Sequence, residues 1–375
     1  MNIVVNTRLL IENKLDGIGW FTYHTLKRIT KNHPEHHFFF LFDRKYSEKF
    51  IFSDNITPIV LIPQTRHPFL WEFWLKISIP LKLKKIDADI FISPDGFLPT
   101  RLQIPSLNVI HDINFAHFPK DLPFFSRLFY NHQFPKFAKK ATRIATVSEY
   151  SKTDLINSYS ISSEKISVVY NGSDASYKPV TKDITEKIKN KYSKGNDFFI
   201  FVGSVHPRKN LIRLIKAFDK FKAKTSHKHK LLIVGDLFFK NSELFKIFNS
   251  LEFKNDIIFT GRMELKELSL LVASASAMTF VPYFEGFGIP ILEAMNCDVP
   301  IISSNITSMP EVAGNAALYV DPYNIDEISE AMIKIIEDKE LRNSLIEKGK
   351  IQREKFSWDK TADKLWKAIE NTMEK

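Results

Sequence analysis

Two carboxylates, Glu285 and Glu293, stand on either side of a glycine turn in the stretch FEGFGIPILEAM. Gly286 and Gly288 would let backbone amides approach a ligand closely. Pro290 suits the first helical position, and Glu293 is expected in the first helical turn, where the helix dipole favours a carboxylate. The stretch therefore has two interpretations, an anion-binding turn or an ordinary helix start with an acidic first turn.

A second stretch, FVGSVHPRKNLIRLIKAF, also has the residue types of an anion site. A buried strand is predicted to end at Gly203 and a helix to begin near Asn210, which puts Arg208 and Lys209 at the helix entry. Arg offers a fork of donors, Lys offers a point charge, and free amides at a helix start favour an anion. A solvated basic loop is the alternative. The P-loop pattern G-x-x-x-x-G-K-[ST] is absent. Two such stretches in one domain strengthen the anion-site interpretation of each.

The N-terminal part of the chain contains two weaker candidates. His111 and Asp112 follow a predicted buried strand and fit a general base with its orienting partner, a metal ligand, or a satisfied polar pair. Gly17 and Gly19 lie in KLDGIGWF, between the first predicted strand and helix, and form either a ligand-facing loop or a simple βα turn.

Short apolar runs alternate with amphipathic segments along the chain, which favours parallel sheets covered by helices on both faces. Strands are predicted at 2–6, 37–42, 88–93, 106–110, 143–147, 198–203, 230–235, 256–260, 277–281 and 299–303. Helices are predicted at 18–31, 71–85, 123–140, 149–158, 209–224, 264–275, 290–296, 325–337 and 339–355. The predicted fold class is α/β, with two Rossmann-like, doubly wound domains facing a cleft and ligands at the strand carboxyl ends.

The stretch 170–183 is rich in turn formers and reads as an interdomain linker. We therefore expect an N-terminal domain at 1–175 and a C-terminal domain at 176–355. The amphipathic segment 356–375 is expected to form a last helix that packs back toward the N-terminal domain.

Bulk composition narrows the classes of partner. The 375 residues carry a net charge of +10, which suits nucleic acid, anionic lipid or phosphorylated small molecules. The basic residues form no long block, so we expect no nucleic-acid partner. No apolar run reaches the roughly 18–20 residues of a membrane span, and the N-terminus reads as a strand rather than a signal peptide. The single cysteine, Cys297, excludes an internal disulfide and fits a reducing cytosol.

The segment 68–86 mixes Trp71 and Trp74 with several lysines. One interpretation is an interfacial helix on an anionic membrane. The other is a helix of the N-terminal domain whose aromatic stripe packs in the core.

Several motifs together resemble a known family. They are EGFGIPILEAM followed by VPIISSNITSMPEVAGNAALYVDP (299–322), VGSVHPRKNL, VSEYSKTDL (147–155), VVYNG (168–172) and the His-Asp pair. In these motifs the sequence resembles the retaining glycosyltransferases of family 4, which have the GT-B fold. The resemblance runs from about residue 1 to the final helix. Within the family, the sequence most resembles the branch of mannosyl- and rhamnosyltransferases that build bacterial surface polysaccharides.

The resemblance implies roles for individual positions. Arg208 and Lys209 match the basic pair that grips the donor diphosphate, and Glu285 matches the first Glu of the E-x7-E motif, beside the donor sugar. Glu293 matches the second Glu, which binds the ribose hydroxyls, and His111 matches a histidine near the donor sugar. The implied catalytic set is Arg208, Lys209, Glu285 and His111. The implied donor-binding set is Gly17, Gly203, Arg262, Met263, Gly286, Phe287, Gly288, Ile289 and Glu293.

Two positions depart from the family pattern. Asp298 stands where relatives often have Gly, in the turn after the second anion-site helix. Ser204 stands where many relatives have an Arg near the strand end, so Arg208 has to supply that charge.

The activity implied by the resemblance is that of a metal-independent, cofactor-free hexosyltransferase. It would transfer a hexose from a nucleotide sugar, with GDP-mannose as first candidate, to a hydroxyl of a saccharide or lipid-linked saccharide. The expected location is the cytoplasm, with peripheral contact to an anionic inner membrane as an option. The alternatives are a UDP- or dTDP-sugar transferase, a non-catalytic nucleotide- or glycan-binding protein, and a phosphorylase or epimerase of related fold.

Overall fold

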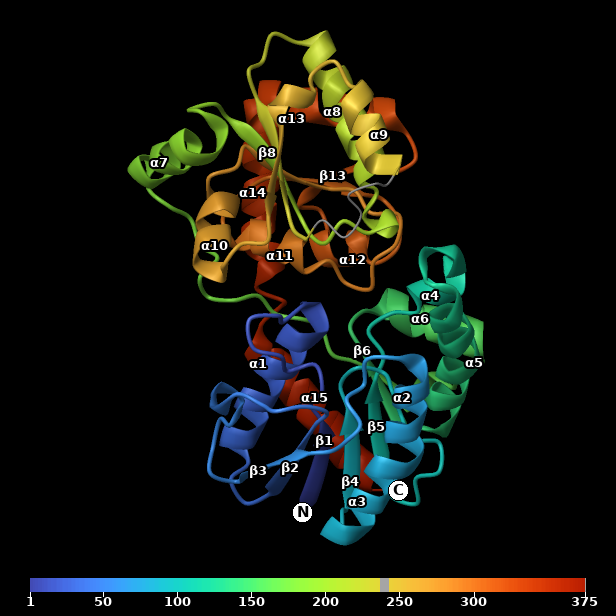
Figure 1. Cartoon of the computed structure of the whole chain (residues 1–375). Coiled ribbons are helices and arrows are strands. Elements are labelled where there is room, and N and C mark those ends of the chain that lie inside the picture. The colour runs from blue at the N-terminus through green and yellow to red at the C-terminus, as the bar shows by residue number, and fades with distance from the viewer. Residues whose placement is uncertain (237–242, 375) are drawn as a thin grey trace. The chain divides into compact units, whose positions relative to one another are not determined.

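The computed structural model describes residues 1–236 and 243–374, and its chain divides into two units (Figure 1). Unit 1 comprises Met1–Gly172 together with Ser357–Lys375, and unit 2 comprises Ser173–Phe356. Each unit is built on a parallel sheet with helices on both faces, which confirms the predicted α/β class.

The sheet of unit 1 has the strand order β3-β2-β1-β4-β5-β6-β7 among the described residues, and all its pairs are parallel. Its strands are β1 Asn2–Asn6, β2 His37–Phe42, β3 Ile56–Val60, β4 Ile90–Ser93, β5 Ser106–Val109, β6 Arg143–Thr146 and β7 Ile166–Val168. The order reverses between β1 and β4. In doubly wound sheets, the crevice at the carboxyl ends beside this reversal is where ligands bind.

Helices cover both faces of this sheet. They are α1 Gly17–Asn32, α2 Pro68–Phe73, the π-helical η2 Trp74–Ser78, α3 Ile79–Ile86, α4 Asn114–His117, α5 Phe124–Lys140, α6 Glu149–Tyr159 and α15 Trp358–Met373. Single 3₁₀ turns are η1 Glu48–Phe50, η3 Pro119–Asp121 and η4 Ser163–Lys165. Contacts of α2 with α5 and of α5 with α6 place these three on one face, and contacts of α1 with α15 mark the other.

The segment 68–86 packs its tryptophans inward. Trp74 is fully buried, and its indole N–H donates to the carbonyl of Leu61 at 3.1 Å. Trp71 lies edge-on against Phe129 at 5.1 Å between ring centres. The core-packing interpretation is therefore confirmed for both tryptophans.

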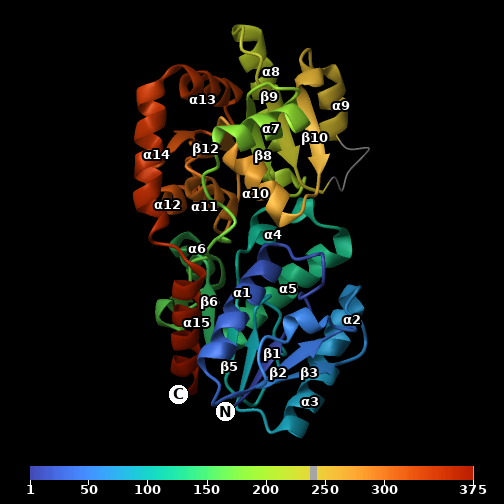
Figure 2. The same ribbon diagram turned by 90° about the vertical axis from the view of Figure 1, so that its left-hand side faces the viewer.

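The last helix, α15, belongs to unit 1 and lies along α1, as Figure 2 shows. Leu365 and Ile369 are buried, and Trp366 stacks on His33 with ring centres 3.6 Å apart. The guanidinium of Arg143 donates to the carbonyl of Asn371 at 2.9 Å, which joins β6 to the end of α15.

The sheet of unit 2 repeats the same design, with order β10-β9-β8-β11-β12-β13 in the described residues and parallel pairs throughout. Its strands are β8 Phe198–Val202, β9 Lys230–Val234, β10 Ile257–Gly261, β11 Ala277–Phe280, β12 Ile301–Ser304 and β13 Ala317–Val320. The strand order reverses between β8 and β11, the two strands that precede the candidate anion stretches.

The helices of unit 2 form two layers. They are α7 Lys182–Ser193, α8 Leu211–Lys224, α9 Glu243–Ser250, α10 Leu265–Ala273, α11 Ile289–Asn296, α12 Met309–Ala313, α13 Ile325–Glu337 and α14 Lys339–Arg353, with 3₁₀ turns η5 Pro207–Lys209 and η6 Lys254–Asp256. α8 contacts α9 and α13 on one face, whereas α10 contacts α7 and α11 on the other.

Candidate functional site

The loop after β8 is shaped by two glycines. Gly203 has a φ of +151° and Gly235, at the end of the neighbouring β9, has a φ of +149°. A Cβ on Gly235 would lie 2.0 Å from the carbonyl oxygen of Gly203, so only glycine fits there. Close approach of the two strand ends starts the loop that leads to η5.

The η5 turn fixes Arg208 and Lys209 at the sheet edge. Pro207 suits the first position of η5. Asn210, the residue directly after η5, adopts a left-handed conformation with φ +62°. The side-chain amide of Asn210 donates to the carbonyls of Val281 at 2.9 Å and Pro322 at 2.7 Å. Asn210 therefore ties the basic turn to the segments that follow β11 and β13.

Glu285 meets both basic residues at this edge. Its Oε1 lies 2.5 Å from an Nη of Arg208 and also forms an ion pair with the ammonium of Lys209. Arg208 donates to the carbonyl of Phe284 at 3.1 Å as well. The Lys209 ammonium lies 4.9 Å from the ring centre of Phe280, and the three charged side chains are 9–20% exposed. The structure thus brings together three of the four predicted catalytic residues, at the strand-order reversal of unit 2.

The glycine turn after Glu285 is buried and packs against Ser308 and Met309. Gly288 has a φ of +90°, and a Cβ there would lie 2.7 Å from the terminal methyl of Met309. The hydroxyl of Ser308 donates to the carbonyl of Glu285 at 2.9 Å. The Phe287 ring packs edge-on against Phe356, so a role of residue 287 toward a ligand falls to its backbone rather than its side chain.

The helix that follows begins one residue earlier than predicted, and this changes the place of Glu293. α11 starts at Ile289, with Pro290 second, and its first turn contains no acidic residue. The expectation of Glu293 in the first turn was therefore wrong. Glu293 is the fifth residue of the helix and accepts a hydrogen bond from the hydroxyl of Tyr177.

Burial around Glu293 shifts its acidity. Desolvation, with a smaller repulsion from Asp174, raises the pKa of the Glu293 carboxyl from 4.5 to about 7, against the hydrogen bond from Tyr177. Desolvation also raises the pKa of Tyr177, which is 5% exposed. Glu293 is therefore a half-buried acceptor for the Tyr177 hydroxyl, with a pKa near neutrality.

The remaining donor-binding candidates of unit 2 lie at the end of β10. Gly261 has a φ of +74° with open space where a Cβ would stand. Arg262 lies 3.5 Å from the carboxylate of Asp236, and both side chains are more than a third exposed. β9 separates β10 from β8, so Arg262 and Met263 lie two strands away from the basic turn.

Asp298 explains why a glycine suits the turn after α11. Its φ is +56°, in the left-handed region where glycine is favoured. The guanidinium of Arg353 contacts the Asp298 carboxylate at 2.9 Å, and this ion pair helps to hold the strained residue.

His111 follows β5 in unit 1. Its Nε2 lies 2.9 Å from the carbonyl oxygen of Pro94 and must be the donor, since a carbonyl only accepts. Burial lowers the pKa of His111, so the ring is neutral at pH 7 and Nδ1 has a lone pair for an incoming donor. The Asp112 carboxylate accepts from the backbone and side-chain amides of Asn114. If His111 is a base, the group that orients its ring through Nε2 is therefore the carbonyl of Pro94 and not the carboxylate of Asp112.

Gly17 is the first residue of α1. Asp16 caps this helix by accepting from the amide of Gly19 at 3.0 Å. A Cβ on Gly17 would meet nothing within 4 Å, whereas one on Gly19 would lie 3.0 Å from Leu15 and 3.3 Å from the carbonyl of Leu9. Gly19 is therefore tightly packed, whereas Gly17 is open on its side-chain side.

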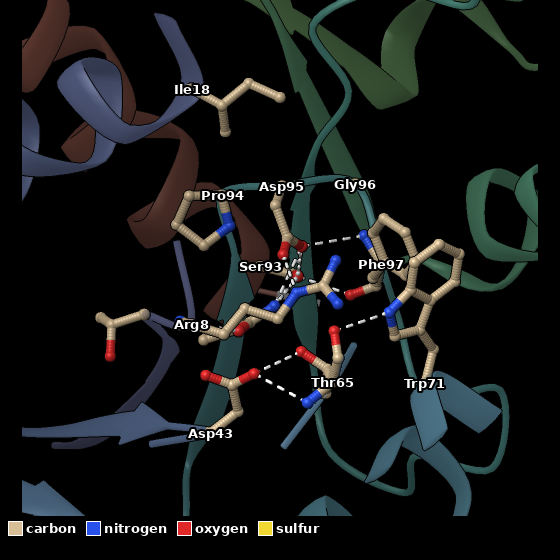
Figure 3. Close-up of polar contacts among 12 residues, drawn as sticks. Arg8, Ile18, Asp43, Thr65, Trp71, Ser93, Pro94, Asp95, Gly96 and Phe97 are labelled. Carbon is tan, nitrogen blue, oxygen red and sulfur yellow. Dashed lines mark hydrogen bonds and ion pairs between the residues drawn. The ribbon is translucent and has the colours of Figure 1, made fainter. Parts of the chain in front are cut away.

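Sequence reasoning missed an ion pair at the strand-order reversal of unit 1, shown in Figure 3. Arg8 follows β1 and Asp95 follows β4; both are buried, and the Nε of Arg8 lies 2.5 Å from an Asp95 oxygen. The other Asp95 oxygen accepts from Asn6, Ser93 and the amide of Phe97 at 2.9–3.1 Å. Opposite charges directly after two buried strands were the available sequence signal.

Two negative findings concern the described residues only. Within 1–236 and 243–374, no group of three or more His, Cys, Asp or Glu side chains is arranged to hold a metal ion. In the same ranges, no helix is long and apolar enough to cross a membrane.

Comparison with known proteins gives two family matches. The profile described as "Glycosyltransferase Family 4" matches residues 15–177, and that described as "Glycosyl transferases group 1" matches residues 183–352. The two matches fall on the two sheets in turn.

Curated relatives are similar over most of the chain. O-antigen chain mannosyltransferase B of Escherichia coli is 28% identical over 72% of this chain and 71% of its own length. O-antigen chain mannosyltransferase RfbU of Salmonella typhimurium is 30% identical over 68% of this chain and 66% of its own, slightly less than two thirds.

Among solved structures, Anabaena Alr3699/HepE in complex with UDP and glucose is similar in fold, with a TM-score of 0.76 at 17% identity. The superposition covers 98% of this chain and 99% of that one. The fold is accordingly GT-B, as the sequence resemblance implied.

Proposed function

The chain belongs to the glycosyltransferases of family 4, and from that premise we propose that it is a retaining hexosyltransferase that uses a nucleotide-sugar donor. The acceptor in this proposal is a hydroxyl of a saccharide or lipid-linked saccharide in surface-glycan synthesis. The observation that carries the proposal is the meeting of Arg208, Lys209 and Glu285 at the strand-order reversal of unit 2.

The basic pair suits a leaving diphosphate. When the bond to the sugar breaks, negative charge grows on the β-phosphate, and fixed cations stabilise that charge. The incoming diphosphate would compete with Glu285 for Arg208 and Lys209, which now share its Oε1. We propose that these cations, together with amides of the glycine turn, take the part that a metal ion would play elsewhere.

Retention would follow from attack on the same face of an oxocarbenium-like centre, with the diphosphate accepting the acceptor proton. Glu285 is poorly suited to be a nucleophile, because two cations already hold its Oε1. Its proposed role is to orient the basic pair and accept a hydrogen bond from the sugar.

The two remaining polar groups suit hydroxyls. Glu293, held by Tyr177, is proposed to accept from the ribose. His111 has a neutral ring whose Nε2 is used by Pro94, so Nδ1 suits a substrate hydroxyl.

Mannose from GDP-mannose is the proposed transfer, because the curated relatives are named mannosyltransferases. UDP is the competing nucleotide, because the structural relative holds UDP and glucose. The proposed location is the cytoplasm with peripheral contact to the membrane that carries the acceptor.

A thermal-shift screen tests the donor class. GDP, UDP, dTDP and their sugars are added in turn, and the nucleotide that binds the folded state should raise the melting temperature. GDP and GDP-mannose are expected to give the largest rise, and Lys209→Ala is expected to reduce it. A rise in melting temperature without either sugar transfer or slow donor hydrolysis would indicate a binding protein instead of an enzyme. No rise with any of the nucleotides would contradict the proposal.

A further inference from the structure

Arg8 follows β1 at the strand-order reversal of unit 1, and the protein uses only part of its guanidinium (Figure 3). Its Nε donates to the Asp95 carboxylate at 2.5 Å. Among the residues that the structure describes, neither Nη atom of Arg8 has a hydrogen-bond partner. The outer edge of this guanidinium therefore consists of donors that the fold does not use.

The surroundings of Asp95 explain why the ion pair has a single contact. Arginine and a carboxylate often pair through two parallel hydrogen bonds. The other oxygen of Asp95 already accepts from the side chains of Asn6 and Ser93 and from the amide of Phe97. Because its lone pairs are taken, that oxygen cannot accept a second hydrogen bond from Arg8.

The neighbouring strand β2 is followed by the more usual arrangement. Arg44 donates through Nε and an Nη to the two oxygens of Asp43, at 2.7 and 2.9 Å. Thr65 donates to the same carboxylate through its amide and its hydroxyl, at 2.8 and 2.5 Å. Arg44 and Asp43 are therefore engaged with each other, whereas Arg8 is engaged on one side only.

The guanidinium of Arg8 is nevertheless held in place. Its carbon lies 4.0 Å from the ring centre of Phe97, and Arg8 is only 6% exposed. Its Nη atoms are not among the fully enclosed polar atoms without a partner in the described part of the chain, so solvent reaches them. A fixed fork of donors loses little conformational entropy when it binds a ligand.

Tyr130 of α5 brings a second polar group to this place. Its ring lies edge-on to Phe97, with 5.7 Å between ring centres. Burial raises the pKa of Tyr130 to about 12, and the charges of Arg8 and Asp95 are near enough to influence it. The hydroxyl is therefore protonated at neutral pH, and the described residues supply it with no hydrogen-bond partner.

The balance of charge indicates which ligand oxygens suit these donors. Asp95 neutralises the charge of Arg8, so an anion gains little from the pair as a whole. A neutral hydroxyl still gains, because a hydrogen bond from a charged donor is stronger than one from a neutral donor. Two hydroxyls on adjacent carbons of a sugar ring are spaced to meet the two Nη atoms of one guanidinium.

We propose that Arg8 selects the acceptor saccharide by binding two adjacent hydroxyls through its two Nη atoms, while the Tyr130 hydroxyl bonds to a third oxygen. The place is the one where doubly wound sheets bind ligands, beside the reversal of strand order. Asp95 is then a positioning residue, which holds Nε so that the outer edge of the fork faces the ligand. The inference rests on the proposed function and names the residues that choose its acceptor.

Acceptor kinetics of the full chain test the proposal. The donor is the nucleotide sugar that most raises the melting temperature, and the acceptors are methyl mannoside, other methyl hexosides and their monodeoxy forms. Arg8→Lys keeps a cation beside Asp95 but removes the fork. Its acceptor KM should rise about tenfold or more, because two hydrogen bonds from a charged group are lost, while donor KM and slow donor hydrolysis stay unchanged.

Tyr130→Phe should raise the acceptor KM about fivefold, because it removes one neutral hydrogen bond. This variant changes no charge, so it keeps the test decisive if Arg8→Lys does not fold. An unchanged acceptor KM in a folded Tyr130→Phe would remove Tyr130 from the site.

Monodeoxy acceptors identify the oxygens that Arg8 binds. Removing either hydroxyl of the bound pair should make an acceptor about tenfold poorer for the wild type. The same removal should cost Arg8→Lys nothing further, because groups in direct contact do not have additive effects. Additive losses would overturn the proposal.

Arg28→Lys is the matched control. Arg28 also meets a carboxylate through Nε, that of Asp359 at 2.6 Å, but its Nη1 donates to the carbonyl of His24 at 3.2 Å. Both KM values should stay unchanged in this variant, and circular dichroism should show every variant folded. An equal acceptor KM in Arg8→Lys and Arg28→Lys would overturn the proposal.

The remaining outcomes separate this inference from the proposed function. An effect of Arg8→Lys confined to acceptors with a carboxylate or phosphate would overturn the assignment of neutral hydroxyls. Donor hydrolysis without transfer to any methyl hexoside would also count against it, since a site for adjacent hydroxyls should accept sugars that present them. A wild-type chain that neither transfers sugar nor hydrolyses donor would contradict the proposed function itself.

Discussion

Each unit places oppositely charged residues across the reversal of its strand order, but the two clusters differ in what their carboxylate does. In unit 1, Asp95 accepts three hydrogen bonds, from Asn6 at the end of β1, Ser93 at the end of β4 and the amide of Phe97, in addition to that from Arg8. In unit 2, the Oε1 of Glu285 faces two cations, Arg208 and Lys209. A saturated carboxylate holds loops together, whereas a cluster with excess positive charge attracts an anion.

The same topology thus supports an ion pair that holds two loops together in one unit and the proposed anion site in the other. Position at the strand ends does not decide between these roles. The balance of charge and the number of hydrogen bonds to the carboxylate do.

Asp95→Ala should give the largest change, a loss of unfolding free energy of about 3–5 kcal/mol, because it leaves the buried Arg8 unpaired. Urea unfolding followed by tryptophan fluorescence measures unit 1 specifically, because all five tryptophans lie in that unit. Asp359→Ala is the control, since its ion pair with Arg28 is exposed and should contribute less than about 1 kcal/mol. If Asp95→Ala and Asp359→Ala lower the unfolding free energy equally, the Arg8–Asp95 ion pair does not have the structural role assigned to it here.

Lys209→Ala should lower kcat/KM about 10²–10³-fold, because it removes one cation from the leaving diphosphate. The measurement is steady-state transfer at low donor concentration. Lys220→Ala is the control on the neighbouring helix α8, where its exposed pair with Asp326 should not matter for transfer. Near-normal kcat/KM in Lys209→Ala would contradict the anion site of unit 2.

Glu293→Gln should change how stability depends on pH. The folded-state pKa of about 7 lies above 4.5, so between these values the folded chain binds more protons than the unfolded chain. The Glu293 carboxyl therefore lowers the free energy of unfolding as the pH rises from about 4.5 to about 7. Urea titrations followed by circular dichroism should show a flatter slope in the variant, and an identical slope would refute the raised pKa of Glu293.

Gly17→Ala should have the smallest effect on the fold, within about 0.5 kcal/mol, because its Cβ would point into open space. If the turn approaches a ligand, donor KM should rise about threefold to tenfold, as for a small steric intrusion. Gly19→Ala is the contrasting variant and should lose stability, since its Cβ would press on Leu15 and Leu9. An unchanged donor KM in Gly17→Ala would make the segment a simple βα turn.

The interior of both sheets could be predicted from the sequence, whereas most edges could not. β3, β7 and β13 were missed, and all three are edge strands. All three are only partly buried; β3 and β7 lack the continuous apolar run that marks a central strand, whereas β13 is apolar throughout but only four residues long. Pro58 interrupts β3 further, and an edge is where a strand tolerates proline.

The basic turn and the glycine turn could be found because short motifs encode them. Their partners could not, because Ser308, Met309 and Tyr177 reach the site through the fold rather than through spacing. The pairing of Arg8 with Asp95 likewise depends on which strands are neighbours in space. Strand order is the information that the one-dimensional pattern lacks.

The position of α15 has a consequence for how the chain is made. Its buried face completes unit 1, yet a ribosome must first synthesise all of residues 173–356. At about 5–20 residues per second, that interval is on the order of 10–40 s. Unit 2, whose residues are contiguous, can finish folding first. The half of the molecule that leaves the ribosome first is therefore the last to be complete, and the surface that α15 covers stays open until the final helix has been synthesised.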